Sequence, residues 1–187
     1  VSDPARTFTN VREAIGYVPW MFNLPYANRG YEAAWSQFTD PRGFRAPYGL
    51  ATAERRHAQF RTHGCCKCEW DGAVWPFATS QTLTALANVL HDYAPERRAS
   101  LGLNDRDTPE PSDARRSESS RTTHHASRTD YFDAFLTYTR SHRFEGRPYI
   151  GEYLDETTGQ WLKGRQERSR YYNHSTYADL LITGVIG

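Results

Sequence analysis

The stretch Glu69-Trp70-Asp71-Gly72-Ala73-Val74-Trp75-Pro76 says most about the fold of this 187-residue chain. It sets two carboxylates beside two indole rings and then runs directly into a helical pattern. From Pro76 onward, the apolar residues at helical spacing are Leu83, Leu86, Val89, Leu90 and Tyr93. This spacing predicts a helix, and Thr79 and Ser80 are candidates for its N-cap.

Helical spacing recurs on both sides of this stretch. Further helices are predicted at about residues 11–18, 31–38, 132–139 and 177–185. Pro19 is expected to end the first of them. Ser127, three residues before Asp130, is expected to cap the third, and Ser175 is a candidate cap for the last.

Long loops rich in aromatic residues are predicted between these helices. They cover residues 20–25, 44–70 and 148–161, with turns at Asp40–Gly43 and Gly159. Because no alternation of apolar and polar residues persists, we expect no extended strands. The sequence therefore predicts an all-α fold with function carried by the loops at one end.

Composition narrows the range of partners. The chain carries 23 basic and 22 acidic side chains, a net charge of +1, so no overall field favours nucleic acid or an anionic membrane. No apolar run approaches the roughly 20 residues that a membrane span needs. The aromatic fraction is 14%, which suits both a core and a groove lined by rings.

One segment differs from everything around it. Residues at about 95–128 are rich in Arg, Ser, Asp, Pro and Thr and contain almost no large apolar side chains. Such a segment buries too little surface to order itself. We therefore predict a flexible surface insertion here.

A second segment, Pro148-Tyr149-Ile150-Gly151-Glu152-Tyr153-Leu154-Asp155, repeats the combination of carboxylates, rings and glycine. Glycine at position 151 lets a substrate approach the backbone closely. A carboxylate at Glu152 can then take a proton from water, which is the general-base role in glycoside hydrolysis. The alternative is a surface glutamate at a turn.

The first segment suits a sugar in the same way. The Trp70 ring can stack on a sugar face while Asp71 accepts hydrogen bonds from hydroxyls. In the alternative reading, Trp70 and Trp75 belong to the core and Asp71 caps a turn. His174, in an aromatic and amide-rich stretch before the last helix, either contacts substrate or belongs to the entry of that helix.

Cys65, Cys66 and Cys68 are the only cysteines. Neighbouring cysteines rarely pair with each other, so a disulfide framework is not expected. A zinc site usually needs a second pair of ligands at matching spacing, and no second cysteine pair exists. We expect buried free thiols and no metal.

Several stretches together resemble one family. They are Gly16–Pro25, Gly43–Leu50, Cys68–Leu83, Tyr149–Glu152, Tyr172–Ser175 and Asp179–Gly184. In this order the chain resembles the C-terminal half of mannosylglycerate-hydrolase-like glycosidases, which are allied to glycoside hydrolase family 63 and the trehalases. The Trp70-Asp71-Gly72 segment carries the most specific part of the resemblance.

The resemblance implies that residues 1–187 form the C-terminal portion of an (α/α)6 toroid, in which six helical hairpins surround a pocket. It implies inverting hydrolysis of a carbohydrate substrate, with Glu152 as the general base and no cofactor. Trp70 and Asp71 look like part of the wall that holds the sugar. Further candidate substrate-binding residues are Trp20, Trp75, Gln81, Tyr149, Trp161 and His174.

One departure from the family pattern matters. The general acid of the family is an aspartate well upstream of the Trp-Asp-Gly segment, and nothing before Gly16 matches that region. We therefore expect the acid to lie on an N-terminal part outside this chain. We also expect the chain to be one piece of a longer protein, stable only with a complementary chain or segment.

Two other functions stay open from the residues alone. One is a carbohydrate-binding or assembly half without a complete catalytic pair. The other is a zinc-dependent glycosidase with a cysteine nucleophile, for which Cys65, Cys66 and Cys68 are the only motive. The sugar is also open among mannosyl, glucosyl and arabinosyl groups.

Overall fold

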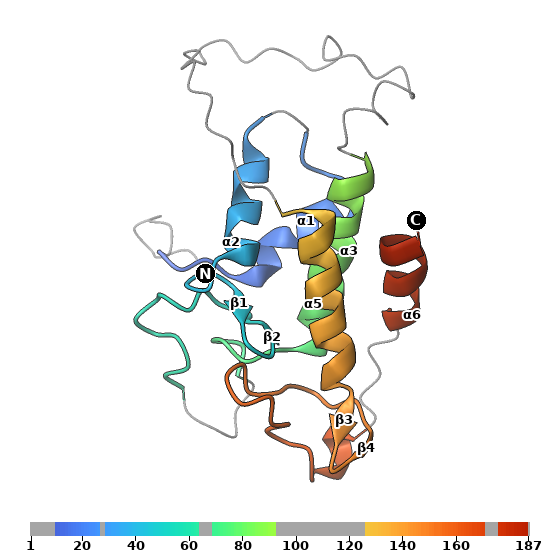
Figure 1. Cartoon of the computed structure of the whole chain (residues 1–187). Coiled ribbons are helices and arrows are strands. Elements are labelled where there is room, and N and C mark those ends of the chain that lie inside the picture. The colour runs from blue at the N-terminus through green and yellow to red at the C-terminus, as the bar shows by residue number, and fades with distance from the viewer. Residues whose placement is uncertain (1–9, 27–28, 64–68, 93–125, 171–175, 187) are drawn as a thin grey trace.

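The computed structural model describes residues 10–26, 29–63, 69–92, 126–170 and 176–186 (Figure 1). Two long helices lie side by side at its centre: α3, Pro76–Asp92, and α5, Arg128–Ser141. The short helix α1, Val18–Met21, packs against α3. This part of the chain is rich in helices, as the apolar spacing predicts.

Helix α3 forms the centre of the core. Its side chains at Leu83, Ala85, Leu86 and Ala87 are buried, because α1, α5 and the C-terminal helical segment cover different sides of the helix. A helix that is covered on several sides needs apolar residues around much of its circumference. The run of alanines and leucines in this helix meets that need.

The start of α3 corrects one prediction. The helix begins at Pro76, so Thr79 and Ser80 lie inside it and do not cap it. A proline fits the first helical turn because the N–H that it lacks would have no partner within the helix. Ser80 instead shares a hydrogen bond with the Tyr138 hydroxyl at 3.2 Å, which joins α3 to α5.

Helix α5 begins as predicted. The Ser127 Oγ accepts a hydrogen bond from the Asp130 backbone N–H, and the Asp130 carboxylate accepts one from the Ser127 N–H, so the capping box is complete. The buried side chains of this helix are Tyr131, Phe135 and Tyr138. Phe132 lies on the exposed side, although its spacing had placed it on the apolar face.

The N-terminal helices differ from the prediction in one respect. A 3-10 helix, η1, Ala14–Tyr17, leads into α1, and Pro19 lies in the first turn of α1. Pro19 therefore starts a helix instead of ending one, and Trp20, expected in a loop, lies within α1. Pro19 follows the same rule as Pro76, since a first-turn proline removes no helical hydrogen bond.

The next helical pattern is confirmed. It forms a 3-10 helix, η2, Tyr31–Trp35, followed directly by α2, Ser36–Thr39. Trp35 and Phe38 are buried, and the Trp35 ring stacks on Tyr17 with 4.2 Å between centroids. This aromatic cluster fixes the N-terminal helices to one another.

Two short hairpins occupy the predicted loops. Strand β1, Arg45–Ala46, pairs with β2, Gly49–Leu50, and β3, Arg143–Phe144, pairs with β4, Arg147–Pro148, both antiparallel. A strand of two residues is too short to show alternation in a sequence. The sequence analysis expected no extended strands. Among the described residues, this expectation fails for these two short hairpins and holds for longer strands.

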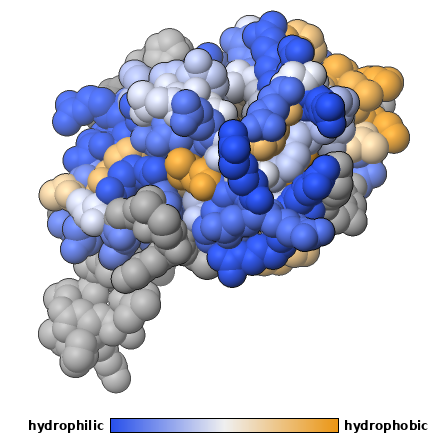
Figure 2. All heavy atoms as spheres, turned by 90° about the horizontal axis from the view of Figure 1, so that it is seen from below, coloured by the Kyte–Doolittle hydropathy of each residue, from blue (hydrophilic) through white to orange (hydrophobic). Residues whose placement is uncertain are grey.

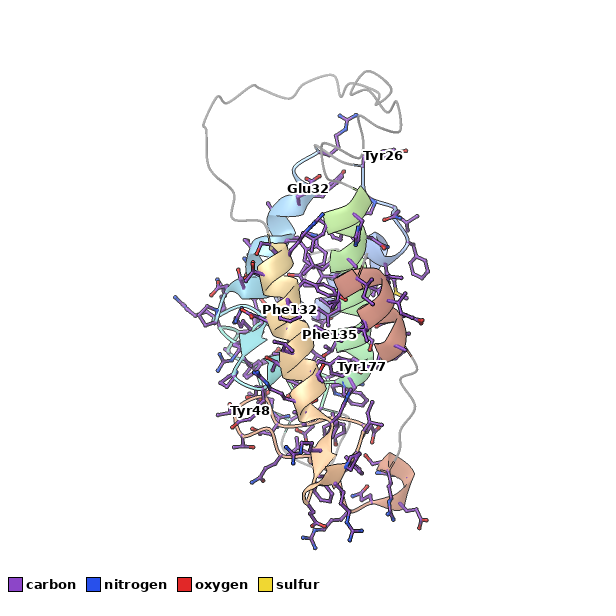
Figure 3. All side chains as sticks on the ribbon, turned by 45° about the vertical axis from the view of Figure 1, so that its right-hand side comes forward. Tyr26, Glu32, Tyr48, Phe132, Phe135 and Tyr177 are labelled. Atoms are coloured by element: carbon purple, nitrogen blue, oxygen red, sulfur yellow. The ribbon has the colours of Figure 1, made fainter. Side chains whose placement is uncertain are left out.

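The C-terminal segment lies along the two central helices. It consists of α6, Tyr177–Asp179, and a π-helical stretch, η5, Leu180–Ile186. Phe135 of α5 and Tyr177 stack with 5.2 Å between centroids and lie where the two elements meet (Figure 3). The predicted cap Ser175 lies outside the described residues. The predicted insertion at 95–128 is described only from residue 126 onward.

Among the described residues, none of the helices is both long and apolar enough to span a membrane.

Apolar surface gathers at one edge of the molecule (Figure 2), on the side where Figure 1 shows the C-terminal segment. Its exposed apolar residues are Leu181, Ile182, Val185 and Ile186.

Candidate active site

The two segments that the sequence singles out lie against each other. Val74 and Leu154 exchange two backbone hydrogen bonds, with N–O distances of 3.0 and 2.9 Å. Leu154 in turn pairs with Trp161, and Val74 with Ala51. These isolated bridges extend the sheet-like pairing across four loops and fix where their side chains point.

A column of three aromatic rings connects the segments. The Trp70 ring stacks on Trp75 at 4.1 Å and 17°, and Trp75 stacks on Tyr153 at 4.8 Å and 24°. Trp75 and Tyr153 are buried, whereas Trp70 is 43% exposed. Trp70 therefore presents one ring face to solvent while its other face is supported by the core.

The loop of Trp70 is also held by its backbone. The Thr52 hydroxyl lies 2.8 Å from the Trp70 carbonyl oxygen and 3.1 Å from that of Ala73. The Trp75 indole N–H donates to the Glu69 carbonyl at 3.3 Å. Because both sides of the loop are fixed in this way, the Trp70 ring is a preorganised platform.

Asp71 points back into its own loop. Its carboxylate accepts the His63 backbone N–H at 3.1 Å and lies 2.9 Å from the His63 ring nitrogen Nδ1. Burial raises the pKa of Asp71, but the contacts with His63 outweigh it and hold the pKa below its ordinary value. Asp71 is thus a carboxylate rather than a proton donor at neutral pH.

Arg61 joins both segments and was missed by sequence reasoning. Its guanidinium pairs with Glu69 on one segment, and with Glu156 at 3.2 Å and Asp155 at 3.4 Å on the other. Its backbone has a φ of 56°, an uncommon left-handed conformation for a residue with a side chain. Its N–H donates to the Asp71 carbonyl at 3.0 Å.

Glu152, the predicted base, lies beside Lys163 and Ser169. Its side chain is 15% exposed, and its backbone N–H donates to the Ser169 Oγ at 3.2 Å. Lys163 Nζ is 3.8 Å from the Glu152 carboxylate. Glu152 is thus partly buried, beside a cation and open to solvent on one side.

Gly151 has a different role from the one that we expected. A Cβ at this position would lie 2.7 Å from the Tyr149 ring and 2.7 Å from the Trp161 ring. The space beside the glycine is therefore filled by protein rings. Glycine is required here for ring packing, which fixes the backbone that precedes Glu152.

A cavity of about 470 Å³ opens beside the exposed face of Trp70. Gln81 lines the same cavity, so the structure brings these two predicted residues together. The other residues around it are mainly apolar: Glu13, Ala14, Ile15, Val18, Thr52, Phe77 and Ala78. Glu152 is not among the residues that line this cavity.

The remaining predicted residues are more deeply placed. Trp20, Trp75, Tyr149 and Trp161 are all buried. The Trp161 indole N–H donates to the Arg143 carbonyl at 2.9 Å, and the Tyr149 hydroxyl donates to the Ser169 carbonyl at 3.2 Å. These bonds tie the rings into the scaffold, and their contact with a sugar stays a prediction.

His174 and the three cysteines lie outside the described residues. Within the part of the chain that the structure describes, His, Asp and Glu side chains form no cluster of three or more that suits a metal ion. The described acids near Arg61 are instead engaged by its guanidinium.

Comparison with known families places the chain among the glycoside hydrolases. Residues 1–175 match the mannosylglycerate hydrolase MGH1-like glycoside hydrolase domain. The chain belongs to this family, which confirms the resemblance seen in its motifs.

One solved structure, named "Sialidase", aligns with 96% of this chain at 53% sequence identity and a TM-score of 0.76. This chain spans only 14% of the length of that protein, so it corresponds to one part of a much longer chain. The search of curated proteins gave no match.

Proposed function

We propose that this chain is the C-terminal portion of an (α/α)6 toroid that hydrolyses a glycosidic bond with inversion, with Glu152 as the general base. One observation carries the proposal. The Val74–Leu154 pairing brings the loop of Glu152 beside the supported ring of Trp70, so a carboxylate and a stacking platform share one end of the helical core.

Glu152 suits the base better than the neighbouring acids. Glu69 is buried and paired with Arg61, and Asp71 is engaged by His63. A base must reach water. Glu69 has a guanidinium partner and Asp71 an imidazole partner, whereas Glu152 has neither among the described residues. Among the described residues, the ion pair of Glu152 is the longer contact with Lys163 at 3.8 Å.

The general acid is proposed to lie outside this chain. An acid that donates a proton near neutral pH needs a raised pKa, whereas the pKa of Asp71 is lowered. The inverting geometry places the two carboxyl groups roughly 6.5–9.5 Å apart, on opposite sides of the sugar. An aspartate on an N-terminal segment of the toroid fits this requirement.

The surface around the cavity supports a missing complementary segment. Ile15 is 70% exposed, Phe22 62% and Leu24 67%, all from the N-terminal helices or the turn after them. Clustered exposed apolar side chains mark surfaces that another element covers. We propose that helices from the rest of the toroid cover this face and close the pocket above Trp70.

The substrate is proposed from the family and the neighbour together. The family is named for mannosylglycerate hydrolysis and the similar structure for a sialidase activity. The test uses the full-length protein with mannosylglycerate, glucosylglycerate, an arabinoside and sialyllactose. It follows the anomeric proton of the product by NMR, or the C3 protons for sialic acid, whose anomeric carbon carries no proton. Inversion with one of these glycosides is expected.

Glu152→Gln should remove turnover while binding of the same glycoside persists by calorimetry. Ser127→Ala, at the start of α5 and far along the chain from Glu152, is the matched control and should keep turnover. Hydrolysis by Glu152→Gln at the parental rate would contradict the assignment of Glu152 as the base.

A second candidate is a carbohydrate-binding half without catalysis. It is favoured by one observation, that Glu152 does not line the cavity of Trp70 and Gln81. In that case Trp70→Ala should abolish sugar binding, and neither the parent nor the Glu152→Gln protein should release any sugar from the four glycosides.

A further inference from the structure

Lys163 is a buried cation. Only 6% of the residue is exposed, although lysine is almost never buried without a compensating partner. Burial of an ammonium group is unfavourable unless nearby charge and dipoles offset its lost hydration. A buried Lys163 therefore needs compensating groups close to its ammonium.

Two neighbouring residues in the chain supply that compensation. The Lys163 Nζ lies 4.8 Å from the centre of the Tyr153 ring and 3.8 Å from the Glu152 carboxylate. Burial lowers the pKa of Lys163, but the Tyr153 hydroxyl and the Glu152 carboxylate outweigh it and hold the pKa above its ordinary value, against a smaller opposing effect of Arg168. Lys163 is therefore an ammonium ion throughout the neutral range.

The contact with Glu152 differs from the other ion pairs of the site. Arg61 binds Glu69 by a direct hydrogen bond that occupies the carboxylate. The separation of 3.8 Å between Lys163 and Glu152 exceeds a hydrogen bond. Lys163 thus places a positive charge beside Glu152 without taking up a lone pair that a water molecule needs.

Lys163 also has a fixed position. It follows Trp161, whose ring packs against Tyr149 and whose indole N–H is bonded to the β3–β4 hairpin. It covers the face of Tyr153, which is the buried end of the aromatic column from Trp70. The charge is therefore tied to the same scaffold that holds the stacking platform.

We propose that Lys163 is the positioning residue of the site: it holds the Glu152 carboxylate in the orientation in which it can accept a proton from water. This inference rests on the proposed role of Glu152 as general base. Lys163 does not touch the reacting atoms and acts only through Glu152.

The other charged groups around this pair come from two places. Arg168, from the 3-10 helix η4, Glu167–Ser169, opposes the charge of Lys163, and Glu69 acts on the Tyr153 hydroxyl from the loop of Trp70. Neither forms an ion pair with Glu152. Replacing Lys163 should consequently change the environment of Glu152 more than any other single charge.

The first test is the steady-state kinetics of the full-length protein with mannosylglycerate. Lys163→Met should lower kcat about tenfold while KM stays within about twofold of the parent value, because a misplaced Glu152 carboxylate slows proton transfer from water without removing a contact to the glycoside. Lys163→Arg, which keeps the positive charge, should recover most of the lost kcat. Arg165→Met, which breaks the exposed pair with Glu145, should leave kcat unchanged.

The second test does not depend on turnover. Melting temperatures are compared for the parent, Lys163→Met, Glu152→Gln and the double variant. Lys163→Met should lower the melting temperature less in the Glu152→Gln background than in the parent. Additive changes of the melting temperature, or a parental kcat in Lys163→Met, would overturn the role of Lys163. Retained turnover in Glu152→Gln would instead overturn the proposed base while the melting cycle still decides the coupling.

Discussion

Val74 and Leu154 exchange two backbone hydrogen bonds at 3.0 and 2.9 Å and so join two loops that are far apart in the sequence. Both side chains are buried. The stacking of Trp75 on Tyr153 crosses this junction, since Trp70 and Trp75 lie on one side of it and Glu152 and Tyr153 on the other.

Arg61 should be the largest single electrostatic contribution to that junction. Arg61→Met leaves the buried Glu69 without its guanidinium and should lower the free energy of unfolding by about 3–5 kcal/mol. Denaturant unfolding measures the change. Arg165→Met is the matched control, since its pair with Glu145 is exposed and should contribute under about 1 kcal/mol. Equal effects of the two variants would contradict the role of Arg61.

Gly151 should tolerate no side chain. Gly151→Ala places a Cβ within 2.7 Å of both the Tyr149 and the Trp161 ring, so the rings must move. Overpacking of this kind costs about 1–3 kcal/mol, measured by thermal or denaturant unfolding. Gly16→Ala is the control because nothing lies within 4 Å of its added Cβ. A Gly151→Ala protein as stable as Gly16→Ala would show that the loop before Glu152 is loosely packed.

Local rules in the sequence predicted local structure well. The capping box of Ser127 and Asp130 needs only three residues of context, and it is present. The prediction that Pro19 ends a helix was wrong. A proline in the interior of a helix interrupts it, whereas a proline in the first turn is compatible with it, and Pro19 lies in the first turn of α1. The apolar spacing predicted only the central part of α5, at about residues 132–139, and it did not show that Phe132 faces outward while Tyr138 is buried.

The site was only partly predictable for the same reason. Trp70, Asp71 and Glu152 stand out because each lies among rings and glycine. Arg61 does not stand out, since its partners Asp155 and Glu156 are distant in sequence. Its left-handed backbone conformation has no signature in the sequence either. Lys163 was missed as well, because a single lysine in a loop is usually exposed.

Trp70 and Trp75 should separate binding from stability. Trp70→Ala removes a half-exposed ring and should weaken binding of a glycoside, by calorimetry, with a modest loss of stability. Trp75→Ala removes the middle of the aromatic column and should lower the free energy of unfolding by about 3–5 kcal/mol. If Trp70→Ala binds sugar as well as the parent, Trp70 is not a sugar platform.

Asp155 should make the junction sensitive to acid. Its carboxylate accepts the backbone N–H groups of Thr157 at 3.0 Å and Thr158 at 2.7 Å. Burial raises the pKa of Asp155, but these bonds, the Thr158 hydroxyl and Arg61 outweigh it, so the pKa lies below its ordinary value.

A group with a lowered folded-state pKa stabilises the fold above its unfolded pKa of about 4, and this contribution is lost as the pH falls through the folded-state value. Asp155→Asn should therefore be less stable than the parent at pH 7, and the difference should shrink towards pH 2. Urea unfolding at pH 7, 4 and 2 measures it. Thr157→Ala, which keeps the backbone donor, is the control and should show no such trend. A stability difference that is constant across these pH values would mean that Asp155 acts through its shape and not through its charge.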